Sequence, residues 1–281
     1  MTPPKLFRSR GSVVSPRRYG VARLARVAWV LGILILPREG SARPSPLPRP
    51  GQDTTHAHPS PAPRLGTLRP LLGTFHLLMT RRQPGDSFFR PFGTVTVIRD
   101  STRLEGEAVL RNVASYDWGG GRTTLDSTLS LVGTVAPLSE RTRTPARIVA
   151  YDLHGLRATG RLGPFDSLRP IDDRLPAPAF NSTDLDMLVT ALRLGGRFEA
   201  ELPLYDPEFP GYRMATLRVT GSTRLRTAHG DRDVWLLSIA EPGRPDLHYR
   251  VDQATHRLWE KTFELRDGTS FRIRDAELRE E

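Results

Sequence analysis

Hydrophobic and polar residues alternate with a period of two over most of the chain after residue 70. Successive side chains of a β-strand point to opposite faces, so each alternating run predicts a strand with one apolar face and one wet face. Such strands are typical of an antiparallel sheet that is covered on one side only. The pattern therefore predicts a mainly β fold. The clearest runs lie at residues 94–97, 104–110, 215–219, 235–239, 247–251, 259–265 and 271–273.

Turn-forming residues separate these runs. Glycine tolerates the backbone conformations that tight turns require, and an Asp before it favours a two-residue hairpin turn. Asp267-Gly268 therefore predicts a hairpin between residues 263–265 and 271–273. The other turn sequences are Gly119-Gly120-Gly121, His154-Gly155 and His229-Gly230-Asp231.

One segment follows the helical period instead, with apolar residues at i, i+3, i+4 and i+7. These residues are Leu185, Leu188, Val189 and Leu192. Ser182-Thr183-Asp184 can cap the helix, and Gly195-Gly196 predicts its end about three turns later. We expect Asp184 and Asp186 to favour the helix dipole from the first turn. Two residues apart, they point away from each other and cannot form a carboxylate pair.

The net charge of +10 belongs to the first quarter of the chain. Residues 1–70 carry twelve Lys or Arg and two acids, whereas residues 71–281 carry 29 basic and 29 acidic residues. A protein that binds nucleic acid keeps its basic residues on the folded surface. The charge distribution therefore excludes nucleic acid as the expected partner.

The basic N-terminus has the organisation of a secretory signal peptide. Seven basic residues and no acid precede the ten residues 27–36, which are apolar or small, and the small residues Gly40-Ser41-Ala42 follow. Ten residues are too few to cross a bilayer, which needs roughly 18 or more. We predict a signal peptide at 1–42 and export to the periplasm or the exterior, with no stable membrane span after cleavage. An uncleaved N-terminal anchor is the alternative, and Arg17-Arg18 leaves twin-arginine export open.

A proline-rich linker follows at residues 43–70, where eight prolines lie among Ser, Thr, Arg and His. Such a composition cannot bury enough apolar surface to fold and predicts a disordered tether. The chain has no cysteine, so disulfides and thiolate metal sites are excluded. Residues 71–278 must then form one domain that is stabilised by its core alone, and about 200 residues suffice for that.

Three stretches of this domain are similar to a known family. The first contains Asp126-Ser127, Leu131, Ala136-Pro137-Leu138, Arg147, Tyr151-Asp152 and Thr159-Gly160. The second contains residues 183–188 and 192–195. The third contains Val219-Thr220-Gly221, Gly230, Trp235, Tyr249-Arg250-Val251-Asp252, Thr255 and Arg257-Leu258.

In order and spacing these stretches resemble a mostly uncharacterised family of exported bacterial proteins with a domain of unknown function. That family is similar in turn to the outer-membrane lipoprotein carriers. The resemblance implies a single curled antiparallel sheet, an open half-barrel of about a dozen strands, with the short helix packed on its concave face. For the carrier relatives it implies an apolar hollow that shelters acyl chains. It implies no catalytic residues.

No catalytic, metal or cofactor motif is present: the sequence has no G-x-S-x-G, H-E-x-x-H, phosphate loop or dinucleotide glycine pattern. His56 and His58 lie in the linker without a second pair of ligands. The sequence therefore indicates a non-enzymatic protein that needs no cofactor. The alternative is a hydrolase that uses the loop carboxylates of Asp172, Asp173 or Glu208.

The predicted function is that of an exported cell-envelope protein whose curled sheet binds a lipid or acyl chain, or an envelope partner. A structural or assembly role in the envelope is a further alternative. Aromatic and aliphatic side chains on the concave face would either pack as core or line an open hollow. The candidate lining residues are Leu185, Leu188, Leu192, Trp235, Leu237, Tyr249, Trp259 and Phe263.

Overall fold

The computed structural model describes residue 65 and residues 68–209 and 211–279. The predicted signal peptide and most of the predicted linker lie outside these residues. At the end of the linker, Leu68 is buried in the main hydrophobic core, with Leu65 packed against that core. Among the described residues, no helix has the length and apolar character that a membrane crossing requires.

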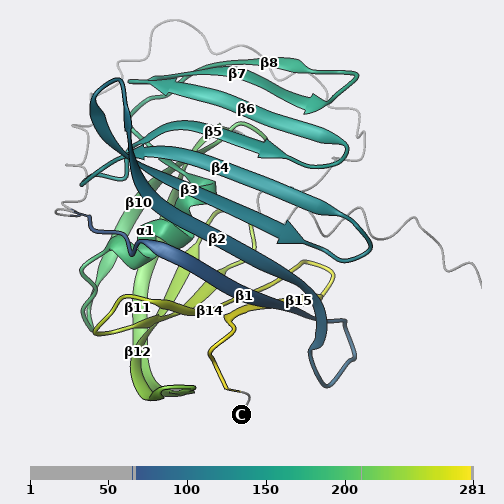
Figure 1. Cartoon of the computed structure of the whole chain (residues 1–281), viewed down its shortest axis with the longest axis vertical. Helices are drawn as coiled ribbons and strands as arrows, with labels where there is room; N and C mark the ends of the chain where they lie inside the picture. The colour runs from purple at the N-terminus through teal and green to yellow at the C-terminus, as the bar shows by residue number, and fades with distance from the viewer. Residues whose placement is uncertain (1–64, 66–67, 210, 280–281) are drawn as a thin grey trace, which may run out of the picture. The chain divides into compact units, whose positions relative to one another are not determined.

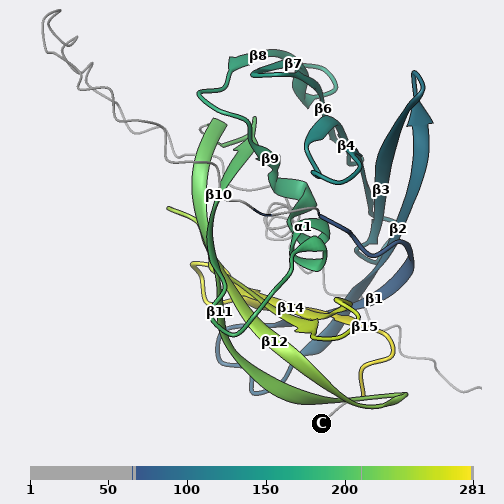
Figure 2. The same ribbon diagram turned by 90° about the vertical axis from the view of Figure 1, so that its left-hand side faces the viewer.

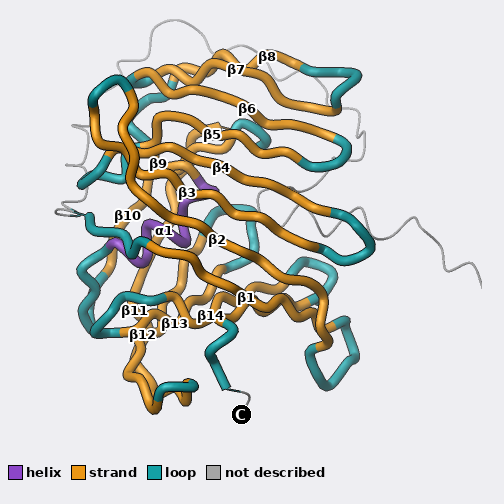
Figure 3. The backbone as a smooth tube through the Cα atoms, in the orientation of Figure 1, coloured by secondary structure: helices purple, strands orange, loops and turns teal. Residues whose placement is uncertain are grey.

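The fold is mainly β, as the alternating pattern predicts, and its strands form one large open sheet (Figures 1 and 3). The sheet contains fifteen strands rather than about a dozen. They are β1 (Gly73–Arg82), β2 (Arg90–Leu104), β3 (Glu107–Asp117), β4 (Thr123–Leu131), β5 (Pro137–Arg143), β6 (Arg147–His154), β7 (Arg157–Pro164), β8 (Arg169–Arg174), β9 (Phe180–Asn181), β10 (Glu199–Asp206), β11 (Gly211–Thr227), β12 (Gly230–Ala240), β13 (Leu247–Asp252), β14 (Leu258–Glu264) and β15 (Ser270–Asp275).

Two runs of sequential hairpins meet in the middle of this sheet. Strands β1 to β8 form one arm and β15 back to β9 form the other, and the pairing of β1 with β15 joins them. All neighbours are antiparallel except β9 and β10. The first and last strands of the domain are therefore central, and the short strands β8 and β9 are its edges.

The hairpin predicted at Asp267-Gly268 is present, since β14 pairs with β15 on either side of that turn. The single strand expected over residues 104–110 is wrong. Strand β2 ends at Leu104, and β3 begins at Glu107. Glu105 and Gly106 both have positive φ, at 51° and 90°. Two successive residues of that conformation make the tight turn of a hairpin, so the run folds back on itself.

The predicted helix forms, but it is shorter than expected. A 3-10 turn, η2 (Ser182–Asp184), leads into α1 (Leu185–Ala191). The cap is Asn181, whose side chain accepts a hydrogen bond from the Thr183 amide. Leu192 is already extended, so the helix ends before the glycines at 195 and 196. It therefore has about two turns rather than three.

The sheet curls around α1, which lies on its concave face (Figure 2). The second arm offers α1 an apolar surface from β10 to β13. On the first arm, the concave face of β4 is polar and buried. The two arms also touch through Tyr151 and Tyr205, whose ring centroids lie 5.3 Å apart. The hollow of the half-barrel is thus filled by the segment that connects the edge strand β9 to its neighbour β10.

Candidate functional site in the concave face

The structure brings five of the eight predicted lining residues together in one core cluster and places a sixth at its margin. Leu188 and Leu192 are fully buried, and Trp235 packs at the edge of the cluster. The other members are Leu185, Leu237 and Tyr249.

The remaining two predicted lining residues lie elsewhere. Trp259 packs with Leu225 and Val234 in a separate small cluster. Phe263 stacks on Phe271, with 5.2 Å between ring centroids. The concave face around α1 is therefore a packed core.

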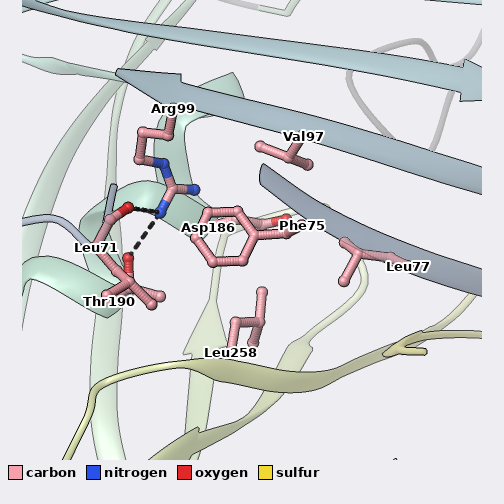
Figure 4. A pocket seen from close by; sticks show the side chains of 8 residues that line it. All are labelled: Leu71, Phe75, Leu77, Val97, Arg99, Asp186, Thr190 and Leu258. Carbon is pink, nitrogen blue, oxygen red and sulfur yellow. Dashed lines mark hydrogen bonds between the residues drawn. The ribbon is translucent and has the colours of Figure 1, made fainter. Parts of the chain in front are cut away.

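A small pocket remains between α1 and strands β1, β2 and β14 (Figure 4). Its volume of about 30 Å³ has room for a water molecule but not for an acyl chain. Most of its lining is apolar, and Arg99, Asp186 and Thr190 supply the polar groups. The apolar residues that line it are Leu71, Phe75, Leu77, Val97 and Leu258.

Arg99 is the buried cation of this pocket. Its Nη1 donates to the Leu71 carbonyl and to Thr190 Oγ1, both at 3.2 Å. Its Nε donates to Asn112 Oδ1 at 3.3 Å. Burial lowers the pKa of Arg99 to about 10, against the opposing effect of the nearby carboxylates. Arg99 thus ties β2 to the end of α1, through Thr190, and to the chain just before β1, through Leu71.

Asp184 and Asp186 point in different directions, as their spacing predicts. Asp186 accepts hydrogen bonds from Lys261 Nζ at 2.8 Å and from the Tyr249 hydroxyl at 3.1 Å, so it binds the second arm. Asp184 binds the first arm, where Thr128 Oγ1 donates to it at 2.6 Å. The two carboxylates therefore attach α1 to opposite sides of the hollow.

Asp184 lies in the first turn, as predicted, but its hydrogen bonds are made to the sheet. Its side chain makes no capping hydrogen bond and is turned into the sheet. There it also accepts hydrogen bonds from Ser130 Oγ at 3.2 Å and Asn112 Nδ2 at 3.3 Å. Burial raises the pKa of Asp184, and these donors oppose that rise.

Two further carboxyl groups lie buried beside it on neighbouring strands. Glu140 accepts hydrogen bonds from the hydroxyls of Tyr151 and Thr183, each at 2.8 Å, and from Thr142 at 3.0 Å. Burial raises the pKa of Glu140 and that of Asp126, the latter to about 8. Oδ1 of Asp126 has no hydrogen-bond partner among the described residues.

This polar face was missed in the sequence. Along β4 the inward residues are Thr124, Asp126, Thr128 and Ser130. The leucines between them, such as Leu125, point outward. A period of two identifies the strand but does not say which face is buried. The only sequence signal for this face was the alternation of four polar residues. Such an alternation is equally typical of a strand face that is exposed to solvent.

The acids of the alternative hydrolase site each have a separate partner. Asp172 accepts a hydrogen bond from exposed Arg157 at 2.7 Å, and Asp173 accepts one from Tyr205 at 2.7 Å. Glu208 forms an ion pair with Arg147. In the part of the chain that the structure describes, no three His, Asp or Glu side chains are grouped so as to hold a metal ion.

Comparisons with known proteins place the chain in a family without an assigned activity. A family model described as "Protein of unknown function (DUF3108)" matches residues 90–271. The chain is also similar to a crystal structure from Brucella abortus, that of a beta-barrel-like protein of domain of unknown function DUF1849. The identity is 12% and the TM-score 0.48, over 75% of this chain and 98% of that chain. No curated protein matches.

Proposed function

The chain belongs to the DUF3108 family of proteins of unknown function, and from this premise we propose that it is an exported, non-enzymatic protein of the cell envelope. Its ligand is an apolar chain such as the acyl group of a lipid. The ligand binds in the hollow of the half-barrel, in the place that α1 occupies in this structure.

The observation that carries this proposal is the burial of α1. Leu185, Leu188 and Leu192 are at most 3% exposed and pack on the apolar concave surface of the second arm. An isolated helix of seven residues does not persist in water, so α1 depends on this contact. An acyl chain would offer the same surface the same kind of aliphatic contact.

Ligand binding on this proposal requires α1 to move, because the pocket beside it holds about 30 Å³. Burial of each leucine stabilises the closed position of α1 by roughly 1.5–3 kcal/mol. A long acyl chain buries a comparable apolar area, so the exchange is close to balanced. The Arg99 pocket lies at the margin of α1 and is where a ligand would first reach apolar surface.

Three further points support the proposal. The leader has the organisation of a signal peptide, which supports export. The candidate hydrolase acids are each bonded to a separate neighbour, which supports a non-enzymatic role. The similarity of the exported family that the sequence resembles to the outer-membrane lipoprotein carriers supports an acyl ligand.

Substitution of Leu188 tests the exchange of α1 for ligand. Leu188→Ala should lower the free energy of unfolding by about 2–5 kcal/mol, as for other buried leucines. It should also raise the affinity for a fluorescent fatty acid several-fold, because it weakens the occupant that the ligand must displace. The matched control is Leu125→Ala, which removes the same atoms from the outer face, where Leu125 is 46% exposed.

Native mass spectrometry of protein purified from its own envelope gives an independent test. Co-purified lipid is the expected result. Repeated ligand-free spectra, together with no binding of fatty acids by either variant, would contradict the proposal. A fall in affinity for Leu188→Ala would show that α1 is a wall of the binding site and does not make way for the ligand.

A further inference from the structure

Three carboxyl groups from different elements converge where the segment before α1 meets the first arm. Asp126 lies on β4 and Glu140 on β5, where their cross-strand partners are Thr142 and Thr128. Asp184 reaches them from η2, the turn that leads into α1. All three are buried, with exposures of 5%, 7% and 1%. The number of hydrogen-bond donors differs among them, and that difference determines where a proton is held.

Asp184 and Glu140 each have several hydrogen-bond donors, which oppose the rise in pKa that burial causes. Asp184 accepts from two hydroxyls and one amide, and its negative charge is opposite buried Arg99. Glu140 accepts hydrogen bonds from the hydroxyls of Tyr151, Thr142 and Thr183. Hydrogen bonds of this kind stabilise the charged form of a carboxyl group.

Asp126 has no comparable set of hydrogen-bond donors. Thr142 is its hydrogen-bonding neighbour, but a threonine hydroxyl has one proton, and this one is donated to Glu140 Oε1 at 3.0 Å. Oδ1 of Asp126 is buried with no partner among the described residues. An ionised Asp126 would therefore be a buried charge without a donor, whereas a protonated Asp126 can donate to the hydroxyl oxygen of Thr142.

We propose that Asp126 is a buried proton-binding site whose occupancy holds the segment 181–191 in the hollow, and that loss of this proton releases the segment. The released proton leaves a negative charge on Asp126 beside Asp184, which belongs to the segment itself. Repulsion between like charges in a site of low dielectric constant then favours the open position of η2 and α1.

The surrounding charges favour the neutral form of Asp126. The carboxyl groups that face it from the packed elements are Glu140 on β5 and Asp184 on η2, and the titratable group of β3 near it is the neutral hydroxyl of Tyr116. Farther acids already have cations of their own: Asp186 pairs with Lys261, and Asp206 with Arg213 and Arg244. Arg99 reaches Asn112 and the α1 side, and no Lys or Arg donates to Asp126 among the described residues.

The direction of the pH effect follows from proton binding. Burial and Glu140 raise the pKa of Asp126 to about 8 while the segment is closed, whereas the pKa of Asp126 returns towards its ordinary value near 4 when the segment opens. Between these two values the closed form holds one proton that the open form releases. The opening equilibrium constant therefore rises up to tenfold per pH unit and levels off above about pH 8.

Hydrogen exchange of the full-length protein, without ligand, tests this inference between pH 5.5 and 9. The quantity measured is the protection factor, the intrinsic exchange rate divided by the observed rate, for amides of α1 and for amides of β12 as a reference. We expect protection of α1 to fall about tenfold per pH unit up to pH 8 while that of β12 stays high. Asp126→Asn should remove this dependence, whereas the exposed-site control Asp172→Asn should keep it.

A second variant keeps the test decisive if Asp126→Asn does not fold. Glu140→Gln removes the like charge beside Asp126, so the plateau should move to lower pH. Protection of α1 that does not change with pH in the unmodified protein would overturn the inference. An equal fall in the protection of the β12 amides would also overturn it, because the proton would then control unfolding of the whole domain. Because no ligand is present, either result leaves the proposed lipid binding to its own test.

Discussion

Asp184 shows how a single buried carboxylate attaches the helical segment to the sheet. It lies at the end of η2 and accepts hydrogen bonds from side chains on β3 and β4, far from it in sequence. A carboxylate just before a helix is ordinarily expected to cap it or to favour its dipole. Here Asn181 has taken the role of the cap, and Asp184 is free to bind the polar face of β4.

Substitution of Asp184 tests this attachment. In Asp184→Asn an amide NH₂ replaces one acceptor oxygen and faces hydroxyl and amide donors. Hydrogen bonds to a charged group contribute roughly 1.5–3 kcal/mol each, so we expect the free energy of unfolding to fall by about 3 kcal/mol. Asp172→Asn removes an exposed ion pair with Arg157 and should leave the urea midpoint unchanged. Equal midpoints for the two variants would show that Asp184 contributes no more than a surface charge.

At the scale of single elements, local signals in the sequence predicted where a turn or helix lies better than they predicted how long each strand or helix is. The turn at Asp267-Gly268 and the helix beginning near Leu185 are confirmed, since glycine conformation and helical periodicity act over a few residues. The turn at Glu105-Gly106 was missed because alternation continues through it. The early end of α1 was missed because Leu192 continues the apolar stripe from an extended backbone.

Gly160 is an element-scale requirement that the sequence does not reveal. It pairs across the sheet with Tyr151, and an added Cβ would meet the Ala150 carbonyl and lie 2.6 Å from the Tyr151 Cα. Gly160→Ala should therefore displace β7 from β6 and lower the free energy of unfolding by about 1–3 kcal/mol. Urea titration with near-ultraviolet circular dichroism measures the loss.

The matched control for Gly160 is Gly221 on β11. An added Cβ there would meet only Leu236 Cδ1, at an ordinary contact distance of 3.9 Å. Gly221→Ala should therefore leave the unfolding midpoint close to that of the unmodified protein. If Gly160→Ala is tolerated equally well, the close approach of β6 and β7 is not a constraint on this position.

At the scale of the whole molecule, the sequence supports an antiparallel sheet but not the way in which the sheet is joined. Any two alternating strands can pair in many registers, so sequence pattern alone does not select the partner of β1. The structure pairs it with β15, with Leu77 opposite Asp275 and Met79 opposite Ile273. The burial of α1 between the two arms depends on that long-range closure, because β1 and β15 hold the arms in one curled sheet.

Removal of β15 should therefore abolish the fold and not merely weaken one edge. A chain that ends after Leu265 lacks buried Phe271 and Ile273, and it leaves both β1 and β14 without their shared partner. We expect this variant to show no cooperative urea transition by near-ultraviolet circular dichroism. A chain that ends after Ala276 keeps β15 and loses only contacts such as the ion pair of Arg257 with Glu277, so it should still unfold cooperatively at a lower midpoint. Cooperative unfolding of both chains at the same midpoint would show that the two arms are stable without their central junction.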